Sequence, residues 1–213
     1  MIVYKIHPVN PQRRHLETVA KILKFQNGIA VYPTDTVYGM GASITNPKAL
    51  ERISRILHKD KTRFFSFICS NFAQISEYAI MSNAHFKLMK RYLPGPFTFI
   101  LPATNLVPKK ISPKRKTIGV RIPLYPAIQQ LVALVGVPLA NASINLPEAM
   151  RGDSDMVISA VRHEVEAMLD AGPLPEPIGS TIVDLTGAEP VIVRPGKGVL
   201  MESGKSGISP SSS

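Results

Sequence analysis

Apolar residues recur along this chain with two different periods, which predict alternating helices and strands. The segment from Asn10-Pro11 to Asn27-Gly28 has apolar residues at helical spacing between a start signal and a stop signal. Short apolar runs such as 29–32 and 137–141 instead predict buried strands. The expected helices are 10–27, 46–57, 72–78, 83–92, 126–135 and 153–169, and the expected strands are 2–6, 29–32, 64–69, 97–101, 117–122, 137–141, 181–185 and 191–194.

This order of elements indicates a single α/β (α+β) domain with a mixed sheet and flanking helices, because strands alternate with helices and then cluster. We expect the domain to span residues 1–200 and find no internal repeat. From residue 201 the chain is rich in Ser, Gly and Pro, a composition that predicts a flexible C-terminal tail over 201–213.

Composition excludes several classes of protein. No stretch approaches the roughly 18 apolar residues of a membrane span, and the first residues lack the pattern of a secretory signal. These features predict a cytoplasmic protein without membrane contact. The single cysteine, Cys69, precludes an internal disulfide and a thiolate cluster, and its apolar strand favours a buried structural thiol. The five histidines are scattered, so we expect no protein-bound metal site.

The positive charge is concentrated in one third of the chain. Lys and Arg number 25 against 15 Asp and Glu, a net charge of +10. Nine basic residues and no acidic one lie between Tyr78 and Pro147, whereas the rest of the chain carries 16 basic and 15 acidic residues. In a folded domain this distribution indicates a positive surface or cavity that suits a phosphate-bearing partner. A soluble basic protein without such a partner is the alternative.

Polar side chains gather where the predicted strands end, which is where ligands bind in sheets with parallel character. Residues 34–38 place two hydroxyls, a carboxylate and a phenol after the strand 29–32. Ser143 and Asn145 follow another strand at a spacing that puts both on one side. Arg121, Ser180 and Arg194 occupy comparable positions. Each group alone could be a turn, a cap or a surface charge, but the repeated pattern favours one shared site.

With these segments assembled, the chain resembles the YrdC/YciO family, whose characterised members include threonylcarbamoyl-AMP synthases. The resemblance runs from about residue 16 to residue 198. Its markers are 32–41 (YPTDTVYGMG), 94–101 (PGPFTFIL), 117–121 (TIGVR), 143–145 (SIN), 180–185 (STIVDL) and 194–196 (RPG), in the order of the family. The resemblance implies a YrdC-like fold, in which a twisted sheet surrounds a large, positively charged cavity.

The reaction that the resemblance implies joins L-threonine, bicarbonate and ATP into threonylcarbamoyl-AMP and pyrophosphate. Other proteins, the threonylcarbamoyl transferases, then pass the group to an adenosine of tRNA. A carbamate oxygen would attack the α-phosphate, a displacement that depends on positioning and charge stabilisation more than on a protein nucleophile. We expect Mg²⁺ to arrive with ATP and to bridge its phosphates, since the cavity segments offer few carboxylates.

The resemblance also assigns roles to individual residues. It implies that threonine is held by Thr34, Arg121, Ser143 and Ser180, with Arg121 pairing to the carboxylate and Tyr38 lining the cavity. It implies that Thr117, Asn145 and Arg194 contact ATP.

The chain departs from the synthase pattern after the second helix. Synthases of the family carry a Lys-x-Arg segment followed by a strand ending in histidine, whereas this chain has Lys59, Lys61 and Arg63 in an ambiguous register and Cys69 near the histidine position. We expect Lys59, Lys61 and Arg63 to supply the catalytic positive charge. Leu146-Pro147-Glu148 replaces the family's Leu-Ser-Gly. These features indicate the YciO branch of the family.

Three functions follow as alternatives. The first is the synthase, and the second is a related enzyme that hydrolyses a nucleotide or an acyl-adenylate in the same pocket. The third is binding of double-stranded RNA or tRNA, in which the basic loop Lys109, Lys110, Lys114, Arg115 and Lys116 would contact phosphates with strong salt dependence. A cavity suited to triphosphate would also attract RNA, so the first and third can coexist.

Overall fold

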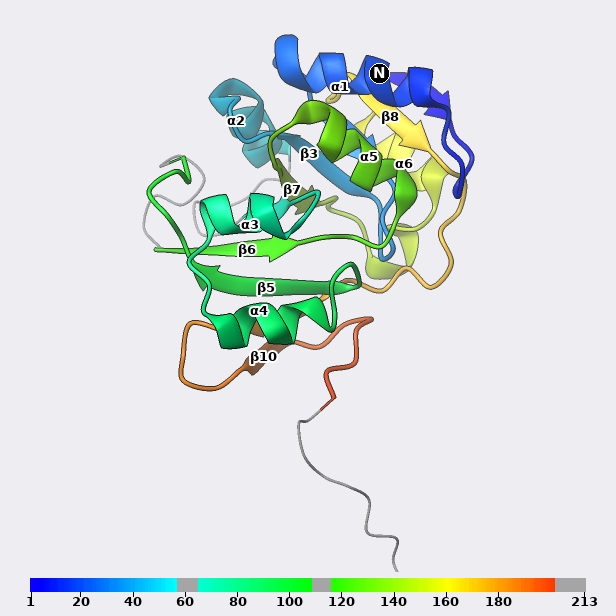
Figure 1. Cartoon of the computed structure of the whole chain (residues 1–213). Coiled ribbons are helices and arrows are strands. Elements are labelled where there is room, and N and C mark those ends of the chain that lie inside the picture. Colours follow the sequence, from blue (N-terminus) through cyan, green and yellow to red (C-terminus); the bar gives the residue numbers. More distant parts are fainter. Residues whose placement is uncertain (57–64, 109–115, 202–213) are drawn as a thin grey trace, which may run out of the picture.

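The computed structural model describes residues 1–56, 65–108 and 116–201. In these residues ten strands form one mixed sheet in the order β1-β8-β2-β3-β7-β4-β6-β5-β9-β10, with helices on both faces (Figure 1). The strands are β1 (Ile2–Lys5), β2 (Ala30–Tyr32), β3 (Gly39–Ser43), β4 (Ser66–Ile68), β5 (Phe97–Pro102), β6 (Thr117–Arg121), β7 (Leu139–Ser143), β8 (Ala167–Asp170), β9 (Thr181–Asp184) and β10 (Val191–Arg194). The helices are α1 (Arg13–Phe25), α2 (Pro47–Ile56), α3 (Phe72–Tyr78), α4 (Asn83–Lys90), α5 (Pro126–Val135) and α6 (Ser154–Val161), with a 3₁₀ turn, η1, at Glu148–Met150.

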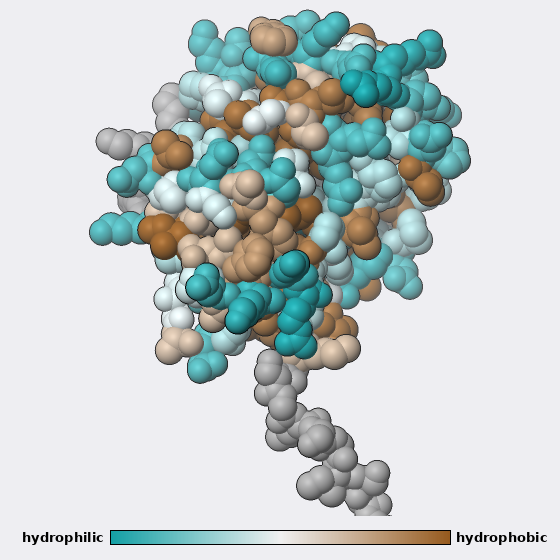
Figure 2. Space-filling model, viewed as in Figure 1, coloured by the Kyte–Doolittle hydropathy of each residue, from teal (hydrophilic) through white to brown (hydrophobic). Residues whose placement is uncertain are grey.

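The two faces of the sheet are covered differently. On one face, α1 and α5 pack on β8, β2 and the start of β7, and bury a compact cluster that includes Leu16, Leu131 and Tyr32. On the other face, α2, α3, α4 and α6 cover the sheet along its length, with Ile53 and Ile75 in the core. The outer surface around α1 is mostly hydrophilic (Figure 2), as expected for a helix with one buried side. Because α1 and α5 pack only on β8, β2 and the start of β7, the face of the sheet that bears them is only partly covered.

Alternating residues decide which side chains enter the core. In β5, Phe97, Phe99 and Leu101 join the core under α3 and α4, whereas Thr98 and Ile100 point to the opposite face. The same period of two operates in β6, where Ile118 and Val120 are buried in the core. The polar and small residues of these strands consequently meet on the partly covered face.

The predicted fold class is confirmed, and one predicted helix is wrong. The helix expected through Leu169 ends at Val161, and residues 167–170 form β8, which pairs in parallel with both β1 and β2. All four β8 residues are buried. Apolar residues on both faces are typical of a central parallel strand, and such a run cannot be distinguished from a buried helix by periodicity.

Other differences concern the ends of elements. The first helix begins at Arg13 rather than at Asn10-Pro11, and its N-cap, Gln12, makes no side-chain cap hydrogen bond. Strand β3 was not expected, because its sequence GMGAS has no β-branched residue. The caps predicted at Asn46 and Asp153 are confirmed, since each side chain accepts a hydrogen bond from a backbone N–H of the following helix.

Among the described residues, no helix is long and apolar enough to cross a membrane. The segment expected to be a tail lies, apart from Met201, outside the described residues.

Candidate functional site

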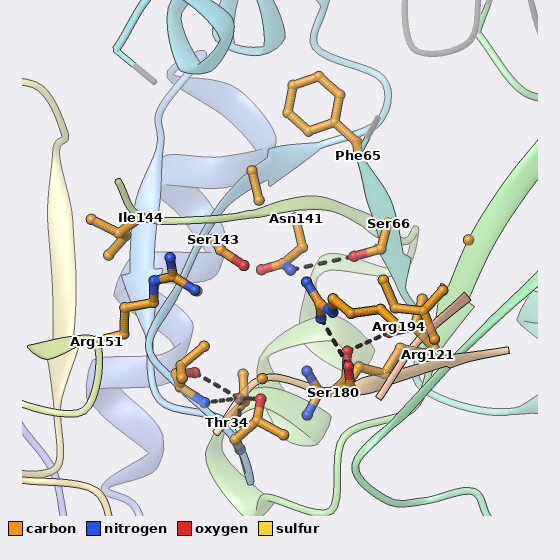
Figure 3. Close-up of a pocket in the computed structure, with 18 of the residues that line it drawn as sticks. Thr34, Phe65, Ser66, Arg121, Asn141, Ser143, Ile144, Arg151, Ser180 and Arg194 are labelled. Atoms are coloured by element: carbon orange, nitrogen blue, oxygen red, sulfur yellow. Dashed lines mark hydrogen bonds between the residues drawn. The ribbon is translucent and has the colours of Figure 1, made fainter. Parts of the chain in front are cut away.

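A cavity of about 580 Å³ lies on the partly covered face, where five neighbouring strands carry polar or small residues. Strands β7, β4, β6, β5 and β9 form its floor, and the turn after β2 and the segment around η1 form its rim (Figure 3). The lining residues are Thr34, Thr36, Val37, Gly39, Phe65, Ser66, Thr98, Ile100, Thr117, Gly119, Arg121, Asn141, Ala142, Ser143, Ile144, Asn145, Arg151, Gly179, Ser180, Ile182, Asp184 and Arg194.

Arg121 is the most deeply buried charge in this site. It ends β6 with only 4% of its surface exposed, and its Nη2 donates to Oδ1 of Asp35 at 2.5 Å. Burial lowers the pKa of Arg121, and the neighbouring Asp35 carboxylate opposes that shift, so the guanidinium stays charged. Its Nε and the second oxygen of Asp35 have no hydrogen-bond partner within the described residues. The ion pair thus leaves one buried donor and one buried acceptor that a ligand or water can hydrogen-bond.

Two further arginines surround the same space. Nη2 of Arg194 donates to the carbonyl of Ser180 at 2.8 Å, and Nε of Arg151 donates to the carbonyl of Leu146 at 2.7 Å. Burial lowers the pKa of Arg194, the carboxylate of Glu148 opposes this, and the charge of Arg151 adds to it. Figure 3 shows Arg151 facing Arg121 and Arg194 across the cavity. Three guanidinium groups around one space favour a ligand with several negative charges.

Hydroxyl groups lie between these charges. Thr34 Oγ1 accepts from the backbone N–H groups of Thr36 and Val37 and donates to the Val37 carbonyl at 2.7 Å, which fixes the turn after β2. Ser180 Oγ lies 2.9 Å from Thr98 Oγ1 on the neighbouring strand. Backbone geometry and cross-strand pairing therefore hold both hydroxyls in place at the cavity wall.

Asn141 lies at the floor of the cavity, and two neighbouring side chains fix its orientation by hydrogen bonds. The hydroxyl of Tyr32, a fully buried residue, donates to its Oδ1 at 3.0 Å, and its Nδ2 donates to Ser66 Oγ at 3.4 Å. Gly39 and Gly41 make this possible, because a Cβ at Gly41 would lie 2.2 Å from the Tyr32 hydroxyl. A Cβ at Gly39 would lie 2.3 Å from Asn141 Oδ1. Both strand glycines thus serve close packing beneath the site.

The structure brings together seven of the residues that the sequence singled out. These are Thr34, Thr117, Arg121, Ser143, Asn145, Ser180 and Arg194, all of which line the cavity. The expectation that Tyr38 lines the cavity is wrong. Its side chain is fully buried, and its hydroxyl donates to the carbonyl of Gly172 at 2.7 Å and accepts from the N–H of Ala171. Tyr38 therefore anchors the chain after β8.

Two groups of predicted residues cannot be placed. Lys59, Lys61 and Arg63 lie outside the described residues, as do Lys109, Lys110, Lys114 and Arg115 of the basic loop. Lys116 is described and exposed, and it does not line the cavity.

Among the cavity residues, Ser66, Thr98, Asn141 and Arg151 were not singled out from the sequence, and the pairing of Asp35 with Arg121 was not predicted. Asp35 lies inside the recognised turn, but its partner Arg121 is 86 positions away in the chain. Thr98, Ser66 and Asn141 were detectable as polar residues inside otherwise apolar strands. Arg151 carries no signal of its own, since it follows a short 3₁₀ turn with no periodicity.

The described residues contain no group of three or more His, Cys, Asp or Glu side chains that could hold a metal ion. The acidic residues at the cavity already have partners: Asp35 pairs with Arg121, Asp184 accepts from the N–H and hydroxyl of Thr186, and Glu148 accepts from the N–H of Gly179. This donor set suits a divalent cation that is carried by the phosphates of a ligand better than one bound by the protein alone.

Comparison with known proteins identifies the class. Residues 22–196 match the Sua5/YciO/YrdC family, described as "Telomere recombination". The chain belongs to this family, and its fold is that of a YrdC-like domain.

Within the family, the chain is 36% identical to YciO of Escherichia coli K12 over 92% of this chain and 95% of that protein. It is 30% identical to a threonylcarbamoyl-AMP synthase of Pyrococcus abyssi over 79% of this chain and 50% of that protein.

Solved structures agree with these relationships. The crystal structure of E. coli YciO superposes with a TM-score of 0.87 at 35% identity, covering 93% of this chain and 98% of that one. P. abyssi Sua5 complexed with L-threonine superposes with a TM-score of 0.85 at 26% identity, covering 92% of this chain and 58% of that one. The expected resemblance to YciO is thereby confirmed.

Proposed function

We propose that this chain binds ATP and L-threonine in the cavity and joins them with bicarbonate into threonylcarbamoyl-AMP and pyrophosphate. The observation that carries the proposal is the convergence of Arg121, Arg151 and Arg194 on a cavity lined with hydroxyl groups. Relatives at about 30% identity named threonylcarbamoyl-AMP synthase support it, as does the P. abyssi Sua5 structure complexed with L-threonine.

The proposed division of the cavity keeps the residue roles that the family resemblance implies. Arg121 binds the threonine carboxylate, with the hydroxyls of Thr34, Ser143 and Ser180 around the amino acid. Thr117, Asn145 and Arg194 contact ATP, and Arg151, on the opposite rim, joins them as a phosphate ligand. Mg²⁺ enters with the nucleotide as part of the substrate.

In the proposed chemistry the neutral amine of threonine first attacks the carbon of bicarbonate, a C–O bond breaks, and a carbamate and water are formed. A carbamate oxygen attacks the α-phosphorus, the bond from that phosphorus to the bridging oxygen breaks, and pyrophosphate leaves. The arginines stabilise the charge that develops on the phosphates, and the walls orient the two reactants. Lys59, Lys61 and Arg63 remain the predicted catalytic cations. The product is proposed to serve tRNA adenosine modification through downstream threonylcarbamoyl transferases.

The alternative is a YciO-like protein that binds nucleotide, double-stranded RNA or both in the same basic cavity without efficient synthesis. It is favoured by the identity to E. coli YciO, 36% over nearly the full length of both chains, against 30% for the synthases.

Mass spectrometry distinguishes the two functions. The protein is incubated with ATP, Mg²⁺, bicarbonate and L-threonine, and threonylcarbamoyl-AMP and pyrophosphate are measured. Product that requires threonine supports the synthase. Arg194→Ala and Arg121→Lys should reduce it by at least tenfold, whereas Arg13→Ala, at an exposed ion pair on α1, should leave it unchanged.

ATP binding without product contradicts the synthase and supports the alternative. Titration of a duplex RNA at rising salt then tests the RNA arm, and a lack of affinity at low salt eliminates it.

A further inference from the structure

Glu148 brings an acidic side chain to the rim of a cavity whose other charges are mostly positive. It begins η1, just after the cavity residues Ser143 and Asn145, and three residues before Arg151. Its Oε1 accepts a hydrogen bond from the backbone N–H of Gly179 at 2.9 Å. Gly179 lines the cavity and lies 31 positions further along the chain. The carboxylate therefore links two segments at the cavity that are distant in the sequence.

The backbone of Gly179 is connected by hydrogen bonds, directly or through Ser180, to several residues around the cavity. Its carbonyl accepts from the N–H of Lys197 at 2.8 Å, and Ser180, the next residue, carries the hydroxyl that meets Thr98. The carbonyl of Ser180 in turn accepts from Arg194. A displacement of Gly179 would thus move Ser180 and Arg194, which are both lining residues.

The space around Gly179 is tight. A Cβ at this position would lie 3.3 Å from Nη2 of Arg194 and 3.4 Å from Oε1 of Glu148. These two opposite charges are consequently within about 7 Å of each other, close enough to interact at the surface of the cavity. Glu148 does more than close a hydrogen bond, because its charge also acts on Arg194.

We infer that Glu148 is a positioning residue, which through Gly179 aligns Ser180 and Arg194 while its negative charge weakens binding of the triphosphate. The effect on threonine and ATP binding rests on the proposed function, whereas the hydrogen bond from Gly179 to Glu148 does not depend on it. The other ties between these segments, such as the hydrogen bond from Leu174 N–H to the Gly152 carbonyl, remain when Glu148 is changed. Substitution should therefore alter the alignment without unfolding the segment.

Two substitutions separate the hydrogen bond from the charge. Glu148→Gln keeps an acceptor oxygen and removes the charge, whereas Glu148→Ala removes both. Glu176→Gln is the matched control, since Glu176 lies on the connection from β8 to β9 that also contains Gly179, is largely exposed, pairs with Lys197 and does not line the cavity. The readouts are hydrogen exchange of the Gly179 amide by NMR, and calorimetric titration with MgATP and with L-threonine.

In Glu148→Gln we expect the Gly179 amide to stay protected, threonine affinity to be unchanged, and MgATP to bind roughly threefold more tightly. In Glu148→Ala we expect the amide to exchange faster and threonine affinity to fall roughly fivefold, since about one hydrogen bond is lost. Glu176→Gln should match the unmodified protein in all three.

The inference is overturned if Glu148→Ala keeps amide protection and threonine affinity, or if Glu148→Gln loses both as Glu148→Ala does. Binding of neither ligand by the unmodified protein would refute the proposed function instead. The amide exchange of the two variants would still decide whether Glu148 positions Gly179.

Discussion

Arg121 and Asp35 form an ion pair that joins the end of β6 to the turn after β2 at the edge of the cavity. The side chains are only 5% and 12% exposed. Two charges at this depth are stable only together, because removing either leaves the other without compensation in a medium of low polarity. The pair therefore ties the architecture of the site to the stability of the domain.

Asp35→Ala should lower the free energy of unfolding by about 3 kcal/mol, because it leaves Arg121 as a buried unpaired charge. Asp35→Asn should cost less, since the amide oxygen still accepts from the guanidinium. Urea denaturation measures both. The control is Glu17→Ala, which removes an exposed i,i+4 pair with Arg13 and should cost a few tenths of a kcal/mol. Equal losses at Asp35 and Glu17 would contradict the role of burial.

Tyr32→Phe should destabilise the domain by about 1–2 kcal/mol, because Oδ1 of Asn141 loses its buried donor. A double-mutant cycle with Asn141→Ala measures the coupling in urea denaturation, and we expect the two losses not to add. Tyr4→Phe, at a strand on the edge of the sheet, is the control. Strict additivity of the Tyr32 and Asn141 substitutions would show that the two side chains do not interact.

Cys69 should resist alkylation in the folded protein. Its side chain is fully buried, and burial raises the pKa of the thiol well above its ordinary value, so the reactive thiolate is absent at pH 8. Incubation with iodoacetamide followed by mass spectrometry should show no label until urea unfolds the chain. Stoichiometric labelling of the native protein would disprove this.

Stability should fall at alkaline pH. Burial raises the pKa of Tyr32, Tyr38 and Cys69 in the folded protein. Above about pH 8.5 for the thiol and about pH 10 for the phenols, the unfolded chain releases protons that the folded chain retains, so rising pH favours unfolding. The free energy of unfolding should therefore be lower at pH 10 than at pH 7.5.

Cys69→Ala should reduce the alkaline loss between pH 8.5 and pH 10, since it removes the first of these groups to ionise. Urea denaturation at intervals across this range makes the comparison. An unchanged slope in the variant would mean that other groups, such as lysines, determine the alkaline behaviour.

Much of the site was predictable, because its residues stand at the ends of apolar strands or interrupt them. Arg121 and Arg194 each end a readable strand, Ser180 directly precedes one, and the structure brings the three to one cavity. Asp35 and Arg151 differ, because the partner of Asp35 is 86 positions away and Arg151 meets the other arginines only across the folded cavity. Local pattern carries no information about such partners.

Individual elements of the fold were not predicted where the local sequence pattern is ambiguous. The run 167–169 is apolar on both sides and fits a helix or a strand equally well, and only its position between β1 and β2 decides. The glycines of β3 lack strand propensity, and close packing against Tyr32 and Asn141 selects them. Tyr38 stood in a ligand-like motif, yet its hydroxyl is used by the backbone after β8.

The connection from β8 to β9 crosses from the second to the ninth position of the sheet in about ten residues. The lining residues Gly179, Ser180, Asp184 and Arg194 therefore lie at the end of this crossing or after it. A nascent chain of only the first 170 residues lacks the lining residues that close one side of the cavity. Assembly of the binding cavity is accordingly one of the last events in the synthesis of the domain, and chains that stop short carry no completed site.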